Sequence, residues 1–134
     1  MKITIIDGQG GKMGKSVIEQ LVKRHPELEL YAIGTNSIAT STMMKAGATY
    51  GATGENPCIV NAADSDIIIG PVGIVFANAL LGEITPAMAV AIGQSPAKKV
   101  LLPVNQCSNI VVGTQSLSLS RLMDEAVELL RSML

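Results

Sequence analysis

Aromatic residues are nearly absent from this sequence of 134 residues, which has no tryptophan, one phenylalanine (Phe76) and two tyrosines (Tyr31 and Tyr50). Proteins that bind single-stranded nucleic acid stack bases on aromatic side chains, so this class is disfavoured. The net charge of −1 also lacks the basic excess that attracts the phosphates of DNA or RNA. We therefore expect no nucleic-acid partner, and a core of aliphatic side chains and methionine.

Cysteine and histidine are equally scarce, with Cys58, Cys107 and His25 as the only examples. The two cysteines lack the spacing of a zinc site or a disulfide framework, which favours two reduced thiols. His25 precedes Pro26 at an expected helix end, away from the expected strand ends. Catalysis by a Cys–His pair or a Ser–His–Asp triad is therefore disfavoured.

No apolar run approaches the roughly 20 residues that a membrane-spanning helix needs. The first apolar run ends at Gly8, which makes it too short for a secretory signal sequence. We expect a cytoplasmic protein without a membrane partner. The length predicts a single domain over residues 1–134.

Apolar runs rich in β-branched residues alternate with segments of helical periodicity along the chain. Strands are expected at Lys2–Asp7, Leu28–Ile33, Asp66–Ile69 and Lys98–Val104, with shorter ones within Ala48–Gly54 and at Ile110–Val112. Helices are expected at Lys15–Arg24, from Asn36 or Ser37 to Ala46, at Asn56–Ala63, Ile74–Leu81 and Thr85–Ile92, and from Ser118 or Ser120 to the C-terminus. This alternation predicts an α/β fold of Rossmann-like type, with a mostly parallel sheet between two layers of helices.

The most informative segment is a glycine-rich loop between the first expected strand and the first expected helix. A glycine backbone can turn sharply and lie close to a phosphate, and the following helix presents free N–H groups to the anion. The pattern G-x-G-x-x-G from Gly8 would require glycine where Met13 stands, whereas G-x-x-G-x-x-G fits Gly8, Gly11 and Gly14. We expect nucleotide binding by the loop residues Gly8, Gln9, Gly10, Gly11, Lys12, Met13 and Gly14.

Small polar residues also follow the other expected strands, whose carboxyl ends share one edge of a parallel sheet. The candidates there are Thr35, Asn36, Ser37, Gly70, Pro71 and Gly73. A NAD site requires Asp or Glu after the second strand for the ribose hydroxyls, and no carboxylate stands at 34–36. The absence of a carboxylate weakens the case for NAD binding and permits NADP binding, although no arginine is there to hold the 2′-phosphate of NADP. The expected cofactor is NADP or NAD, and a mononucleotide or another small phosphorylated ligand stays open.

Chemistry at this edge could come from Asp7, Glu55, Glu83 or Lys12. We expect Asp7 to brace the glycine loop by accepting backbone N–H bonds. Glu55 and Glu83 are expected to complement the N-termini of the helices that they precede. The sequence Gly14-Lys15-Ser16 also permits a P-loop of nucleotide hydrolases, but Gln9 stands where that motif requires glycine.

Three hypotheses for function remain open. The chain could be an NADP-linked enzyme completed across a dimer, a non-catalytic nucleotide sensor acting through a protein partner, or a purely structural domain. An aliphatic stripe on the final helix favours a homo-oligomer; its members are Leu122, Ala126, Leu129, Leu130 and Met133.

Two resemblances follow from these motifs. The loop Gly8–Gly14 resembles the cofactor loop of dihydrodipicolinate reductases, which implies a nicotinamide cofactor, although this chain has no room for their second, substrate-binding domain. Over nearly its full length the sequence resembles a family of small uncharacterised bacterial proteins with a Rossmann-like domain. The stretches that carry this resemblance are Ile6–Gly11, Gly34–Ser41, Gly51–Asn56 and Gly82–Ala89.

Overall fold

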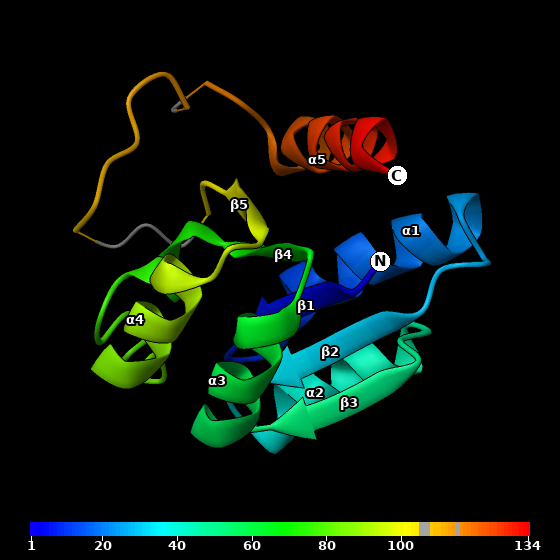
Figure 1. Ribbon diagram of the computed structural model, residues 1–134. Helices are drawn as coiled ribbons and strands as arrows, with labels where there is room; N and C mark the ends of the chain where they lie inside the picture. The colour runs from blue at the N-terminus through cyan, green and yellow to red at the C-terminus, as the bar shows by residue number, and fades with distance from the viewer. Residues whose placement is uncertain (105–107, 115) are drawn as a thin grey trace.

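Five parallel strands form one sheet through the centre of the molecule (Figure 1). A computed structural model describes residues 1–104, 108–114 and 116–134. The strands are β1 (Ile3–Asp7), β2 (Leu30–Gly34), β3 (Tyr50–Thr53), β4 (Ile67–Pro71) and β5 (Lys98–Leu102). Their order across the sheet is β3-β2-β1-β4-β5. The expected α/β fold of Rossmann-like type is confirmed.

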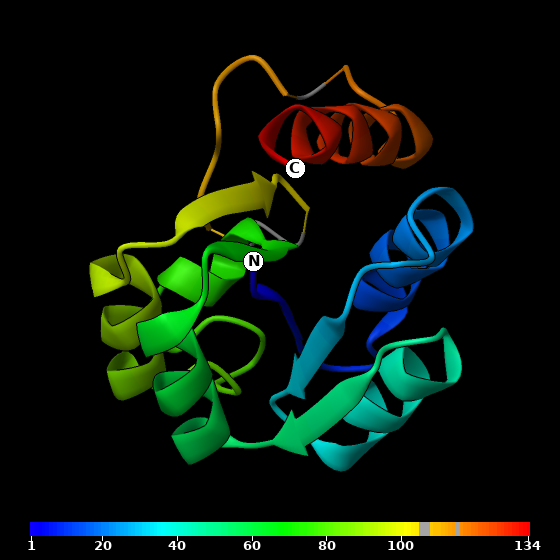
Figure 2. The same ribbon diagram turned by 45° about the vertical axis from the view of Figure 1, so that its right-hand side comes forward.

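Helices cover both faces of the sheet. They are α1 (Lys12–Arg24), α2 (Ser37–Lys45), α3 (Glu55–Asp64), α4 (Pro86–Gln94) and α5 (Leu119–Met133), with a short 3-10 helix, η1, at Val72–Val75. Helices α3 and α4 lie on one side of the sheet, and α1, α2 and α5 lie on the other (Figure 2). None of the helices in the described parts of the chain is long and apolar enough to span a bilayer.

Two aliphatic cores hold the three layers together. One core joins β1, β2, β4 and β5 to α1, α2 and α5, and includes Ile5, Ile18 and Leu130. The other joins the opposite face of the sheet to α3 and α4, and includes Ile68, Cys58 and Ile92. The β1 strand is buried on both faces, as the continuous apolar run predicts.

Side-chain caps fix where three of the helices begin. Asn36 Oδ1 accepts a hydrogen bond from the Ala39 amide at 2.9 Å, so α2 begins after Asn36. Thr85 Oγ1 accepts from the Met88 amide at 3.1 Å, and Pro86 follows at the first position of α4. Ser118 Oγ accepts from the Arg121 amide at 3.2 Å and begins α5. All three caps are among those that the sequence predicts.

Several local predictions are wrong. The strand expected to end at Ile69 continues to Pro71, and the helix expected to end at Ile92 continues to Gln94. The expected helix at Ile74–Leu81 is a 3-10 turn followed by irregular backbone, because Leu80 and Leu81 adopt φ values of 56° and 57°. The expected strand at Ile110–Val112 is not a strand, and Val112 is 91% exposed.

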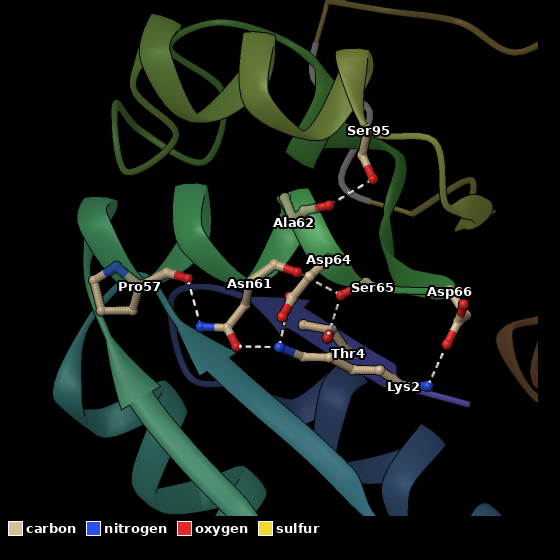
Figure 3. Close-up of polar contacts among 9 residues, drawn as sticks. All are labelled: Lys2, Thr4, Pro57, Asn61, Ala62, Asp64, Ser65, Asp66 and Ser95. Atoms are coloured by element: carbon tan, nitrogen blue, oxygen red, sulfur yellow. Dashed lines mark hydrogen bonds and ion pairs between the residues drawn. The ribbon is translucent and has the colours of Figure 1, made fainter.

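A polar network ties β1 to α3 at the amino-terminal edge of the sheet (Figure 3). Lys2 Nζ donates to Asn61 Oδ1 at 2.9 Å and forms an ion pair with Asp64 at 2.7 Å. Thr4 Oγ1 and Ser65 Oγ lie 2.6 Å apart in the interior and share a hydrogen bond. These polar groups satisfy one another, so this edge has a structural role, and the opposite, carboxyl edge holds the loops of the candidate site.

Candidate functional site

The glycine loop connects β1 to α1 by two residues in left-handed conformations. Gln9 has φ 50°, and Gly11 has φ 71° and precedes the first residue of α1. The Gly11 amide donates to the Gly8 carbonyl at 2.9 Å and closes the turn. A Cβ atom added to Gly11 would lie 2.8 Å from the Ala39 carbonyl oxygen on α2. Glycine is therefore required at this position by both conformation and space.

Asp7 holds this loop from beneath, as the sequence predicts. Its two carboxylate oxygens accept hydrogen bonds from the amides of Gly8 and Gly14, each at 2.8 Å. Only 4% of the Asp7 surface is exposed. Burial raises the pKa of Asp7 above its ordinary value, the two backbone hydrogen bonds oppose this rise, and the nearby Glu83 charge adds to it.

Glu83 approaches the same loop from the other side, a contact that no sequence pattern predicts. Its Oε1 atom accepts from the Gln9 amide at 2.9 Å, from Thr35 Oγ1 at 2.6 Å and from Asn36 Nδ2 at 2.7 Å. Desolvation raises the pKa of Glu83, but these three hydrogen bonds outweigh it and leave the pKa below its ordinary value. The expected role of Glu83, complementing the N-terminus of α4, is therefore replaced by a contact with the end of β2.

This contact changes the interpretation of the second strand end. The sequence has no carboxylate at 34–36, and on its own this absence is compatible with NADP binding. Asp7 and Gly34 are paired neighbours at the ends of β1 and β2, and Glu83 accepts hydrogen bonds from Gln9, two residues after Asp7, and from Thr35, directly after Gly34. A carboxylate is therefore present at the end of β2, although it comes from a distant part of the chain.

A cavity of about 510 Å³ opens on the α1 and α5 side of the loop. It is lined by Asp7, Gly8, Gln9, Gly10, Gly11, Lys12, Met13, Ser16, Val104 and Leu119. Its volume lies within the range of small-molecule sites. Of the loop amides, those of Gly8, Gly11 and Gly14 are already hydrogen-bonded within the loop. The amides of Gly10 and Lys12 have no acceptor among the residues that the structure describes.

The predicted site residues separate into three groups. Gly8, Gln9, Gly10, Gly11, Lys12 and Met13 line the cavity, whereas the amide of Gly14 is directed to Asp7. Thr35 and Asn36 bind Glu83, and Ser37 is exposed at the first turn of α2. Gly70, Pro71 and Gly73 are buried in β4 and η1 and do not contribute to the lining.

Three lining residues were not predicted. Ser16 lies one turn beyond Lys12 on α1, so helical spacing could have identified it. Val104 and Leu119 flank the connection between β5 and α5, and no sequence pattern brings them to the loop. They add apolar surface beside the polar loop.

The remaining titratable candidates lie apart from the cavity. Glu55 Oε1 accepts a hydrogen bond from Thr85 Oγ1 at 2.6 Å, in the first turn of α3. His25 lies at the C-terminal end of α1, and Cys58 is fully buried in α3. Cys107 lies outside the described residues. Within the described ranges, no three side chains of the metal-binding types are close enough to hold an ion together.

Residues 2–134 match the model of a family described as "Domain of unknown function (DUF3842)". The chain belongs to this family. The predicted membership of an uncharacterised family with a Rossmann-like domain is thus confirmed. The matches give no support to the likeness between the loop and dihydrodipicolinate reductases.

The sequence matches no curated protein. Among solved structures, the chain is similar to the dodecameric FMN-dependent UbiX-like decarboxylase from Escherichia coli O157:H7. The two are 16% identical, with a TM-score of 0.46, and the alignment covers 98% of this chain and 76% of the decarboxylase chain. A likeness this distant gives no guide to the ligand or the assembly of the present chain.

Proposed function

We propose that this chain binds a phosphate-bearing nucleotide in the cavity on the glycine loop. The observation that carries the proposal is the combination of that cavity with two backbone amides, of Gly10 and Lys12, that have no acceptor among the described residues. A phosphate group can accept both hydrogen bonds. The nucleoside would then extend along Val104 and Leu119, which supply apolar contact.

The local charges also fit a bound anion. Helix α1 begins at Lys12 and spans 13 residues, so its dipole places a partial positive charge at the loop. The exposed Lys12 side chain adds a full positive charge at the cavity wall. The negative charge of Asp7 counteracts the positive charges of the helix dipole and Lys12, but the raised pKa of Asp7 makes this carboxylate easier to neutralise than an ordinary aspartate. Lys12 is therefore the main electrostatic attraction for phosphate.

Of the two nicotinamide dinucleotides, the structure disfavours NADP. A 2′-phosphate at the end of β2 would meet the Glu83 carboxylate, whose low pKa keeps it ionised at neutral pH. NAD has ribose hydroxyls at that position, which could donate to a carboxylate. Oε1 of Glu83 already accepts three hydrogen bonds, so a ribose hydroxyl that donates to this oxygen would compete with Gln9, Thr35 and Asn36.

Thermal unfolding against a ligand panel tests the proposal. The panel holds adenine and guanine nucleotides, nicotinamide mononucleotide (NMN), NAD, NADP, FMN, FAD and S-adenosylmethionine. A ligand at about 100 times its Kd stabilises the native state by roughly 2.7 kcal/mol, which raises Tm by several degrees. If no member of the panel raises Tm, the proposal is wrong.

Two pairs of variants locate the bound ligand. A Cβ added to Gly10 approaches only Lys12 side-chain carbons, at 3.8 and 4.0 Å, so Gly10→Val should leave the fold intact and fill part of the cavity. Gly93→Val is its control, because an added Cβ there contacts nothing within 4 Å. Lys12→Met removes the charge at the cavity, and Lys15→Met removes one on the same helix that does not line it. Gly10→Val and Lys12→Met should reduce the ligand-induced rise in Tm, and the two controls should not.

A further inference from the structure

The turn from Phe76 to Glu83 folds over the carboxyl ends of β1 and β2. Leu80 anchors it in the core beneath α3 and α4, with 2% of its surface exposed. The Asn78 amide donates to the Ile84 carbonyl at 2.7 Å and closes the turn. Asn78, Leu80 and Leu81 all have φ between 56° and 65°, a conformation that residues other than glycine rarely adopt. The surrounding contacts therefore hold this turn in one shape.

This turn brings two side chains against Gly8. A Cβ atom added to Gly8 would lie 2.9 Å from Leu80 Cδ1, 3.1 Å from Glu83 Oε1 and 2.7 Å from Thr35 Oγ1. The space between the glycine loop and the end of β2 is thus filled by the chain itself. The cavity, in contrast, is lined by Val104, Leu119 and Ser16 and does not extend to Thr35, Asn36 or Glu83.

A dinucleotide needs space on both sides of the glycine loop. In doubly wound folds its two phosphates cross the N-terminus of the first helix, and one ribose lies at the end of the second strand. In this chain that second position holds the Glu83 carboxylate and its three hydrogen-bond donors. Among the described residues, the cavity of about 510 Å³ beside the loop lies on the side toward α5.

We propose that Glu83 restricts the site to ligands of mononucleotide size and excludes dinucleotides. The inference rests on the proposed function and adds to it the size class of the ligand. A mononucleotide places its phosphate on the Gly10 and Lys12 amides and its nucleoside in the cavity. A dinucleotide must in addition displace Glu83 from Gln9, Thr35 and Asn36, and its second phosphate approaches a carboxylate.

The test is to measure Kd for matched ligand pairs by isothermal titration calorimetry. NMN is compared with NAD, and FMN with FAD, since each dinucleotide is the mononucleotide joined to AMP. The wild-type chain should bind at least one mononucleotide about tenfold or more tightly than the corresponding dinucleotide, because only the dinucleotide must break the three hydrogen bonds of Glu83.

Glu83 variants identify the cause of this selectivity. Glu83→Ala empties the space and removes the charge, and should bring the two Kd values of a pair within about threefold of each other. Glu83→Gln keeps the volume and one acceptor oxygen, and should retain most of the selectivity. Glu55→Ala is the matched control, since Glu55 is a carboxylate that accepts from Thr85 at 2.6 Å and does not line the cavity. It should leave the ratio unchanged.

The outcomes separate the inference from the proposed function. If no mononucleotide or dinucleotide binds, both are wrong. If the wild-type chain binds neither NMN nor FMN more tightly than the corresponding dinucleotide, nucleotide binding stands and the size restriction is overturned. A selectivity that persists in a folded Glu83→Ala variant also overturns the role of Glu83. The wild-type ratio decides the size restriction even if Glu83→Ala does not fold.

Discussion

Replacing Gly11 by alanine should destabilise the fold, whereas the same replacement of its neighbour Gly10 should not. Gly11 adopts φ 71°, and an added Cβ would lie 2.8 Å from the Cα and the carbonyl oxygen of Ala39. An added Cβ at Gly10 meets nothing closer than 3.8 Å. The two positions therefore differ in conformation and in space, although both line the same cavity.

The size of the effect follows from three contributions. A left-handed backbone costs a non-glycine residue about 1–2 kcal/mol. Overpacking against a fixed backbone adds about 1–3 kcal/mol. Alanine lowers the conformational entropy of the unfolded chain, which offsets about 0.4–1 kcal/mol of this destabilisation. Gly11→Ala should therefore lower the free energy of unfolding by about 1–4.6 kcal/mol.

Thermal and urea unfolding of the ligand-free variants measure this difference. The entropy of unfolding is about 2.1 cal/mol/K per residue, so a chain of 134 residues loses about 3.5 °C in Tm for each kcal/mol of free energy of unfolding that is lost. Gly11→Ala should thus unfold about 4–16 °C below the wild type, and Gly10→Ala within about 2 °C of it. A Gly11→Ala variant as stable as the wild type would refute the close approach of the loop to α2.

Three further predictions concern pH, thiol chemistry and assembly. Folding lowers the pKa of Glu83, so the ionised form of Glu83 stabilises the native state at a pH above the unfolded-state pKa. This stabilisation is lost as the pH falls through the folded-state pKa. In thermal melts below pH 4.5, the acid-induced loss of Tm should therefore be smaller for Glu83→Gln than for the wild type. Equal losses would contradict the hydrogen bonds of Glu83. Burial, with a smaller effect of the Glu55 charge, raises the pKa of Cys58 to about 11. In a Cys107→Ser variant, Cys58 should therefore react with iodoacetamide only in denaturant. Rapid reaction of the folded protein would contradict the burial of Cys58. Because Leu129 on α5 is 50% exposed, light scattering after gel filtration should give a multiple of 14.0 kDa that Leu129→Glu reduces, and a monomeric wild type would contradict self-association.

The sequence predicts well the features that depend on neighbouring residues. The buried run of β1 followed by glycine and a helical period is sufficient to place the loop. Thr85 and Pro86 identify the start of α4, since capping is local. The bracing role of Asp7 also follows, because the amides that it binds lie one and seven residues away.

The missed features depend on contacts between distant parts of the chain. Glu83 lies 74 residues from Gln9 and 48 from Thr35, and no periodicity links these positions. The turn that carries Glu83 places Leu80 and Leu81 in left-handed conformations, so an apolar segment with helical composition is not a helix. Tertiary packing of Leu80 outweighs local propensity there.

Amide chemical shifts during a nucleotide titration test the central claim most directly. In ¹H–¹⁵N spectra recorded with NMN or FMN, the amides of Gly10 and Lys12 should show the largest shifts. The phosphate would become their hydrogen-bond acceptor, and none of the described residues serves as one. The amides of Gly8 and Gly14 should change less, since Asp7 already binds them at 2.8 Å. Saturable shifts at Gly10 and Lys12 would confirm that the loop binds phosphate. Shifts confined to other parts of the chain, or none at millimolar ligand, would contradict it.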